Sequence, residues 1–201
     1  MKVEGGARVF RDEIRLLRSR RHLAAAGLDA LKRLLAAAAE TADWADFRRA
    51  GDAVKLTMLA AVGALSDAGG MGHDHVRFGI LGGNGAGCGG ENAHFWSDYV
   101  ENERMGRGGL FVGTLNSIPV CEAAIALGAH GAAGYVSGDD WEQAAAAFLR
   151  GNRLSRLLLV ETGPARADAL LLAPSETSLR SGGGEFGNFC DRINEVMLWS
   201  K

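Results

Sequence analysis

The sequence predicts an α/β fold, in which a mixed or parallel sheet is covered by helices on both faces. Segments with strand character alternate along the chain with segments that have helical spacing, and this alternation is typical of sheets packed between helices. The predicted strands are apolar throughout, which is typical of strands that are buried on both faces.

The N-terminal fifty residues are predicted to be helical. Five leucines recur there at helical spacing: Leu23, Leu28, Leu31, Leu34 and Leu35. An arginine-rich stretch at residues 15–21 would lie on a solvated helix face or contact an anionic partner. A second helix is predicted over residues 52–68, because apolar residues recur every three to four positions and a glycine pair follows.

Strands and helices alternate from residue 76 onward. Strands are predicted at residues 76–81, 110–112, 133–137, 157–161 and 169–172. Helices are predicted at residues 91–102, 119–127, 139–149 and, after a glycine-rich loop at 175–184, 186–198. We therefore expect a mixed five-stranded sheet and three parts of the chain: a helical extension (1–50), an α/β domain (51–174), and a loop with a terminal helix (175–201) that belongs to that domain.

Composition excludes several classes of function. A length of 201 residues suits one domain, and a net charge of −2 gives no bulk basic character for binding nucleic acid. The 3 cysteines have no metal-binding spacing and predict a reducing, cytoplasmic compartment. No apolar stretch reaches the roughly 18 residues of a membrane span, and the N-terminus does not fit a signal peptide.

The glycine-rich stretch after the strand at 76–81 is the main candidate binding motif. Residues 85–90 fit G-x-G-x-x-G, whose glycines let the backbone approach a pyrophosphate in dinucleotide-binding proteins. That fingerprint also needs an acidic residue at the end of the next strand, about 20 residues further on, and none is found there. Gly85, Gly87 and Gly90 are therefore weak candidates for ligand binding, and a tight strand-to-helix turn is the simpler interpretation.

Several segments, taken in order, resemble the N-terminal half of a β-ketoacyl synthase. A helix ends in Asp67-Ala68-Gly69, a strand of the type V-G-V-I-x-G-x-G-x-G follows at residues 76–85, and Phe95-Trp96 lies on the next helix. A segment from Thr114 then leads to small residues at Gly128 and Gly131. The resemblance covers about residues 50–172 and is carried by the order and spacing of the segments. It implies a thiolase-like half-fold in three layers, with the N-terminal helices as an addition.

The resemblance implies a catalytic site that this sequence does not reproduce. Ketosynthases use a cysteine at the N-terminus of a buried helix, together with two histidines from the second half of the fold. Here the position of the nucleophile falls on Asp140, and all 5 histidines precede it. Ser137 and Asp140 fit the helix-capping pattern S-x-x-D, so a structural role is the simpler interpretation. Contact of the carboxylate with a ligand or partner is the alternative.

Other residues offer weaker candidates for chemistry. Cys88, with His94 on the following helix, could form a thiol–imidazole dyad, and Cys121 could supply a second nucleophile, although free cysteines are most often small buried apolar residues. Asn116 could contact a ligand, but a role in capping the next helix is simpler. His73 and His75 do not complete a metal site, so we expect neither a metal nor a cofactor.

The sequence therefore leads to competing functional hypotheses. The first is a non-catalytic accessory subunit, similar to a chain-length factor of fatty-acid-like or polyketide biosynthesis. It would form a homodimer or pair with a ketosynthase, could contact an acyl carrier protein, and would bind neither nucleic acid nor membrane. The others are a small acyl-transfer enzyme that uses Cys88 or Cys121, a nucleotide-binding protein that uses residues 85–90, and a structural or regulatory module that kept only the fold.

Overall fold

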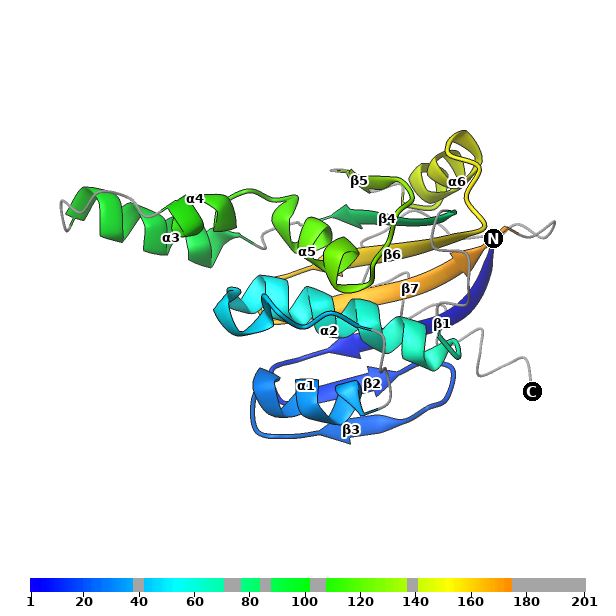
Figure 1. The fold of residues 1–201 in the computed structure, drawn as a ribbon, viewed down its shortest axis with the longest axis horizontal. Coiled ribbons are helices and arrows are strands. Elements are labelled where there is room, and N and C mark those ends of the chain that lie inside the picture. The colour runs from blue at the N-terminus through cyan, green and yellow to red at the C-terminus, as the bar shows by residue number, and fades with distance from the viewer. Residues whose placement is uncertain (38–41, 71–76, 84–87, 102–107, 137–140, 175–201) are drawn as a thin grey trace.

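The computed structural model describes residues 1–37, 42–70, 77–83, 88–101, 108–136 and 141–174. Its strands form one mixed sheet in the order β3-β2-β1-β7-β6-β4-β5 (Figure 1). The strand bounds are β1 Lys2–Val9, β2 Glu13–Leu16, β3 His22–Ala24, β4 Phe78–Gly83, β5 Ala133–Tyr135, β6 Arg156–Thr162 and β7 Ala167–Ala173. Strand β4 is parallel to β5 and β6, and the other neighbouring pairs are antiparallel.

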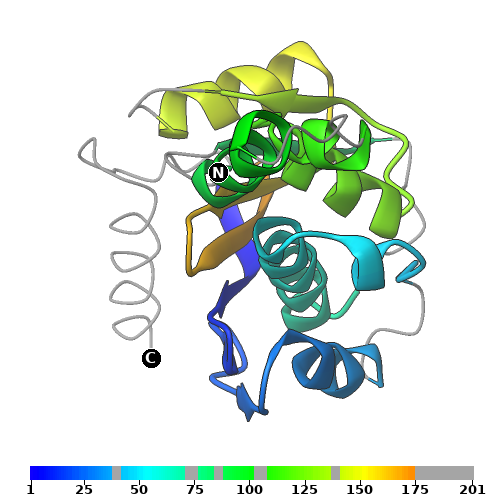
Figure 2. The same cartoon turned by 90° about the vertical axis from the view of Figure 1, so that its left-hand side faces the viewer.

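Helices lie on both faces of this sheet. Their bounds are α1 Leu28–Ala36, α2 Asp52–Asp67, α3 Gly89–Trp96, α4 Gly108–Gly113, α5 Ile118–Ala126 and α6 Trp141–Gly151, with a 3₁₀ turn at Phe47–Arg49 and a π turn at Ser97–Glu101. Helices α1, α2 and α5 share one buried cluster with the sheet, whereas α6 packs in a separate cluster on the opposite face. Figure 2 shows α1 and α2 together on one side of the N-terminal strands. The predicted α/β class with helices on both faces is confirmed.

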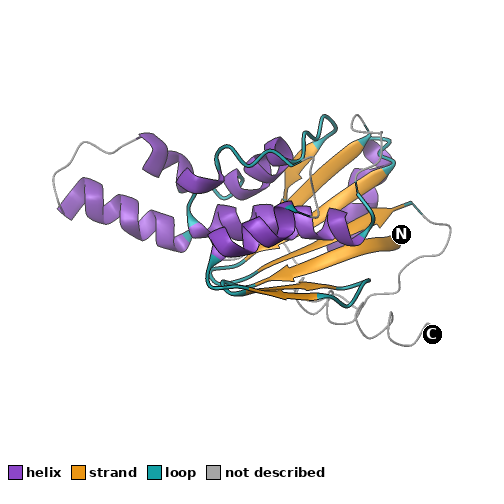
Figure 3. Ribbon diagram, turned by 60° about the horizontal axis from the view of Figure 1, so that its bottom comes forward, coloured by secondary structure: helices purple, strands orange, loops and turns teal. Residues whose placement is uncertain are grey.

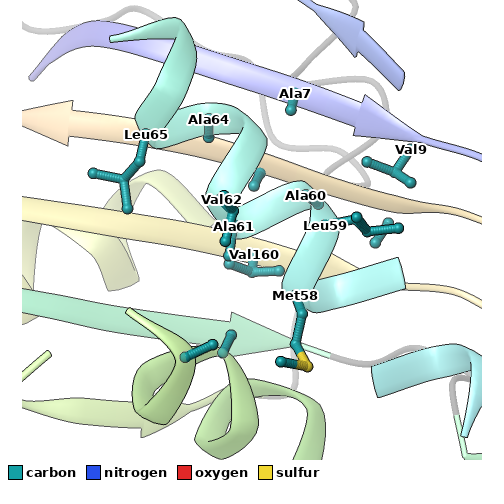
Figure 4. Packing of buried hydrophobic residues seen from close by; sticks show 14 of the residues in the cluster. Ala7, Val9, Met58, Leu59, Ala60, Ala61, Val62, Ala64, Leu65 and Val160 are labelled. Carbon is teal, nitrogen blue, oxygen red and sulfur yellow. The ribbon is translucent and has the colours of Figure 1, made fainter. Parts of the chain in front are cut away.

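Helix α2 is the centre of the larger cluster. It is apolar almost all round, and it contacts β1, β7 and β6 of the sheet as well as α5 and α1. Figure 4 shows its residues Met58 to Leu65 above β1 and β6. Two glycines permit the close approach: a Cβ on Gly5 of β1 would lie 2.6 Å from the carbonyl oxygen of Ala64, and one on Gly63 would lie 2.9 Å from the Cβ of Ala7. Small residues therefore set the spacing between helix and sheet.

The prediction of a helical N-terminal segment is wrong for residues 1–24, and the described residues form a sheet of seven strands rather than five. Strand β1 pairs with β7, so the N-terminal segment is part of the sheet itself. The leucine spacing predicts a helix correctly only for α1. In β2, buried Ile14 and Leu16 alternate with half-exposed Glu13 and exposed Arg15, which is the two-residue period of a strand. The arginine-rich composition of this stretch hid that period in the sequence.

A second prediction that is wrong concerns residues 110–112, which belong to α4 rather than to a strand. A run of three apolar residues has no measurable period, so the sequence fits either structure. Here the run lies beside α3, and Phe111 and Val112 are exposed.

The remaining predicted elements that fall on described residues are confirmed, with ends shifted by a few positions: α2, α3, α5, α6, β4, β5, β6 and β7. The predicted loop at 175–184, the helix at 186–198 and Asp140 lie outside the described residues, and the division into domains stays a prediction.

The carboxylate of Asp67, at the end of α2, joins the helix to the N-terminal strands. Its Oδ2 accepts the backbone N–H groups of Gly6 (3.1 Å) and Arg18 (2.7 Å), and its Oδ1 accepts that of Ser19 (2.9 Å). Asp67 is buried, so these donors satisfy a charge that would otherwise be costly to remove from water. One side chain thus connects α2, β1 and the turn between β2 and β3.

We expect Asp67→Ala to lower the free energy of unfolding by about 3 kcal/mol, because it leaves three backbone donors without their charged acceptor. Urea denaturation followed by circular dichroism measures the change. Asp67→Asn is the matched control: it keeps one carbonyl oxygen as acceptor and should lose less. Equal midpoints for the wild type and Asp67→Ala would show that the carboxylate does not hold these strands.

Candidate functional site

The carboxyl ends of the parallel strands form the candidate functional edge of the sheet. Strands β4, β5 and β6 run in the same direction, so Gly83, Tyr135 and Thr162 end at one edge. In open α/β sheets this is the edge at which ligands are usually bound. The glycine-rich stretch and Asp140 both follow strands that end here.

The glycines at the end of β4 are explained by helix packing. A Cβ on Gly82 would overlap Val120 of α5, and a Cβ on Gly83 would overlap the ring of Trp141 at the start of α6. Neighbouring residues of a strand point to opposite faces, so the pair admits one helix on each face of the sheet. This close packing accounts for the first two glycines of the stretch without a bound pyrophosphate.

Of the three glycines predicted as ligand-binding positions, Gly90 is described, whereas Gly85 and Gly87 lie outside the described residues. Gly90 lies in the first turn of α3, is exposed, and has open space where a Cβ would project. Packing therefore does not require a glycine at this position, which lines a hollow beside the helix. Its role in binding stays a prediction.

This hollow, of about 500 Å³, lies at the carboxyl edge between the N-terminus of α2 and helix α3. Its volume is in the range of small-molecule sites. Six elements or turns contribute to its wall, through Arg11, Arg49, Ala50, Gly51, Asp52, Ala53, Gly90, Glu91, His94, Gly113 and Pro164. Arg11, Arg49 and Glu91 were not identified from the sequence, because the first two fall in the segment predicted as a helical extension and Glu91 matches no motif.

Charges in the hollow are partly balanced within the chain. Arg11 forms an ion pair with Asp52, and a Cβ on Gly51 would lie 2.7 Å from Oε1 of Glu91. Gly51 is the N-cap residue of α2 and supplies no side-chain cap, so the carboxylate of Glu91 lies where the helix dipole favours a negative charge. Arg49 and His94 line the same hollow with exposed side chains.

Cys88 and His94 lie in different surroundings in the structure. Cys88 is the N-cap residue of α3, is only 2% exposed, and its thiol donates to the carbonyl oxygen of Leu115 at 3.6 Å. His94 is exposed and lines the hollow. Cys88 and His94 are six positions apart, which corresponds to about 9 Å of rise along a helix. This separation does not favour a hydrogen bond between the thiol and the imidazole. The dyad remains an untested prediction that this geometry does not support.

Cys121 and Asn116 are exposed on or beside α5, outside the wall of the hollow. Asp140 lies outside the described residues, and α6 begins one residue later at the buried Trp141. The resemblance implies a helix just after the position of the nucleophile, and α6 occupies that place.

Within the described residues, no cluster of three His, Cys, Asp or Glu side chains could hold a metal ion. None of the helices described is long and apolar enough to cross a membrane.

Comparison with solved structures reveals the fold, although no family model and no curated protein matches the sequence. A chain from the ketosynthase ApeO in complex with its chain length factor ApeC, from Xenorhabdus doucetiae, is similar with a TM-score of 0.57 and 14% identity, covering 87% of this chain and 79% of that one. The chain has a ketosynthase-like fold. A chain from the ishigamide ketosynthase/chain length factor gives a TM-score of 0.58 at 16% identity and covers 89% of this chain.

A third similar structure is AntDE:AntF, a type II polyketide synthase acyl-carrier protein in complex with its ketosynthase bound to the hexaketide, with a TM-score of 0.55, 14% identity and 87% of this chain covered. This chain spans 63% of the ishigamide chain and 62% of the AntDE:AntF chain, so it is clearly shorter than both. The matched chain of the ApeO–ApeC complex, in contrast, is only modestly longer than this protein, because 79% of it is covered. A polypeptide of about this size thus occurs within a ketosynthase–chain length factor complex.

Thiol labelling tests the burial of the two described cysteines. In a Cys190→Ser background, we expect Cys121 to react with iodoacetamide at least about tenfold faster than Cys88, because only Cys121 is exposed and the reactive thiolate needs access. Peptide mass spectrometry after timed quenching distinguishes the two sites, and Cys121→Ser is the control that should remove the fast phase. A fast phase on Cys88 would instead indicate an activated, accessible thiol.

Glu122, next to Cys121 on α5, gives a pH-dependent prediction. Burial raises the pKa of its carboxyl group, and the nearby negative charge of Asp46 raises this pKa further. The folded state therefore favours the protonated form, so the contribution of Glu122 to stability is present below its ordinary pKa and is lost as the pH rises through the folded value.

We expect Glu122→Gln to increase the free energy of unfolding at pH 7, by at most about 1 kcal/mol because the group is partly solvated, and to have no such effect below about pH 4. Denaturation midpoints measured across this range check the sign. Asp46→Asn should give a smaller increase in the same direction. If Glu122→Gln lowers the free energy of unfolding at pH 7 relative to the wild type, the assignment is contradicted.

Proposed function

We propose that this protein is a non-catalytic, chain-length-factor-like subunit that pairs with a ketosynthase in polyketide or fatty-acid-like biosynthesis. The observation that supports this most directly is the likeness to a chain of similar length in the ApeO–ApeC complex. The other two similar structures also come from ketosynthase assemblies, and one of them contains an acyl-carrier protein. Contact with an acyl carrier protein through the assembled pair is part of the proposal.

The described residues around the carboxyl edge support an accessory role. The sequence has Asp140 where the resemblance implies the cysteine nucleophile, and a carboxylate does not replace a thiolate in acyl transfer. Cys88, which follows the glycine-rich stretch, is buried with its thiol engaged by the carbonyl of Leu115. Two charged groups of the hollow, Arg11 and Asp52, form an ion pair with each other. None of this chemistry amounts to an activated nucleophile with its base.

The proposal is tested by co-expressing the tagged chain with each ketosynthase encoded in its own genome. We expect one of them to co-purify as a stoichiometric complex, measured by size-exclusion chromatography with light scattering. An unrelated ketosynthase of the fatty-acid pathway from another organism serves as the control. Failure of every native ketosynthase to form a complex would contradict the pairing.

The same complex tests the absence of catalysis. After incubation with an acyl-loaded carrier protein, intact-mass spectrometry should find the acyl group on the ketosynthase and none on this chain. An acyl adduct on Cys88 or Cys121 would overturn the accessory role and favour a small acyl-transfer enzyme instead.

A further inference from the structure

The amino edge of the sheet lies at the opposite end of the strands from the candidate functional edge. Strands β1, β4 and β6 all begin there, because β7 is antiparallel to both β1 and β6. The turn between β2 and β3 and the turn between α6 and β6 lie at the same edge. Figures 1 and 3 show the N-terminus at this end of the sheet and helices α3 and α4 at the other end. Segments that are far apart in the sequence therefore meet at the amino edge.

Exposed basic side chains gather at this edge. Lys2 lies at the start of β1, three arginines lie in the turn between β2 and β3, and Arg153 lies in the turn before β6. At the carboxyl edge Arg11 forms an ion pair with Asp52, but none of the ion pairs among the described residues includes any of these five side chains. We call these five exposed residues the basic edge: Lys2, Arg18, Arg20, Arg21 and Arg153.

Contacts through Glu4 of β1 join the two halves of the basic edge. The guanidinium of Arg18 donates to the backbone carbonyl of Glu4 at 3.2 Å, and Nε of Arg156, at the start of β6, donates to the carboxylate of Glu4 at 2.7 Å. Arg153 lies just before Arg156, in a turn that its N–H closes by donating to the carbonyl of Arg150 at 3.2 Å. The basic edge therefore crosses from the turn after β2 to β6, a span of about 15 Å at the usual spacing of strands.

Hydrogen bonds hold the backbone that presents the three arginines of the turn. The buried carboxylate of Asp67 accepts the N–H groups of Arg18 and of the next residue, and the N–H of Leu16 donates to the carbonyl of Arg21 at 2.8 Å. Between these anchors, Arg20 has a left-handed backbone with a φ of 55°. A turn held in this way loses less conformational freedom on binding a partner than a flexible turn would.

Carboxylates are the anions that this edge already binds within the chain. Glu4 is held by Arg156, and Asp67 is held by the backbone of the arginine-rich turn. Nucleic acid fits this surface less well, because binding of single strands relies on aromatic side chains on which bases stack. The large aromatic side chains that the described residues leave exposed all lie on α3, the π turn and α4, at the other end of the sheet. The chemistry therefore favours an acidic polypeptide.

We propose that the basic edge docks an acidic polypeptide segment of another protein, whose carboxylates pair with the exposed arginines. Complementary charges of this kind steer association and set specificity. Strand β6 has 7 residues, so the basic edge lies about 20 Å from the carboxyl edge, to which a carrier protein would deliver an acyl group in the proposed function. The partner is therefore distinct from such a carrier protein, and the inference does not depend on pairing with a ketosynthase.

The test is fluorescence anisotropy of a labelled deca-glutamate peptide titrated with the full chain. The wild type should bind the peptide, and salt raised from about 50 to about 200 mM should weaken binding, because exposed ion pairs are screened. Arg20→Glu and Arg153→Glu should each raise the dissociation constant at least about threefold. Both residues are exposed and have a left-handed backbone, although they are far apart in the sequence. Arg48→Glu is the matched control, because Arg48 is equally an exposed arginine but lies in the 3₁₀ turn before α2, outside this edge.

Circular dichroism and urea denaturation of each variant establish that weaker binding is not loss of fold, and Arg153→Glu carries the test if Arg20→Glu does not fold. No binding by the wild type, or equal weakening by Arg48→Glu, overturns the proposal. Tighter binding of decathymidylate or of phosphatidylserine vesicles than of the peptide, with the same dependence on Arg20, would assign the edge to nucleic acid or to a lipid surface and overturn it.

The native acyl carrier protein is the further probe. Its binding to the chain should be unchanged by Arg20→Glu, and a loss of binding in this variant would show that the carrier itself is the partner, contrary to the proposal. Failure to find a ketosynthase complex, with peptide binding at the basic edge intact, would contradict the proposed function alone.

Discussion

Close packing of helices on glycines is the constraint on which this structure depends. Helix α2 rests on Gly5 of β1, α5 rests on Gly82, and α6 covers Gly83 and, through Phe148, Gly134. A Cβ at any of these positions would lie within 3 Å of the helix above it, so the helices approach the sheet only because the side chain is absent. The two helices on β4 therefore meet the strand at its carboxyl end. That placement brings the first turns of α5 and α6 to this end of β4.

The same constraint explains which sequence predictions succeeded. Helix α2 and strands β6 and β7 are long apolar runs with one plausible period, and all three lie where the sequence places them. In β1, by contrast, Gly5 and Gly6 interrupt the apolar pattern, because one is needed beneath α2 and the other is crowded by Leu17 and Leu170. The glycines that let β1 pack in the sheet thus remove the signal that would predict this strand. Local periodicity contains no information about a partner strand that lies 160 residues away in sequence, as in the Arg8–Asp168 pair.

The candidate site was less predictable than the fold, for a related reason. Gly90 and His94 were identified from the sequence and line the hollow, but the hollow also contains Arg11, Arg49 and Pro164, which come from turns far apart in the chain. No motif spacing links these residues, because the topology of the sheet brings them together. Conversely, the pairing of Cys88 with His94 looked plausible from spacing, yet the helix directs the thiol to Leu115 and the imidazole to the hollow.

Which groups already have partners within the chain, and which remain exposed to water, bears on what the protein does. Polar groups near the carboxyl edge find partners in the chain: Arg11 pairs with Asp52, the thiol of Cys88 with a carbonyl, and Thr162 with Thr57 of α2 at 2.6 Å. Helices α3 and α4, by contrast, leave large apolar side chains such as Trp96 and Phe111 in water. Burial of an aromatic side chain contributes roughly 2 kcal/mol, whereas polar groups that are already paired have little to gain from a ligand. Association that buries these apolar side chains would therefore be favourable, which supports the proposal of a subunit that acts by pairing.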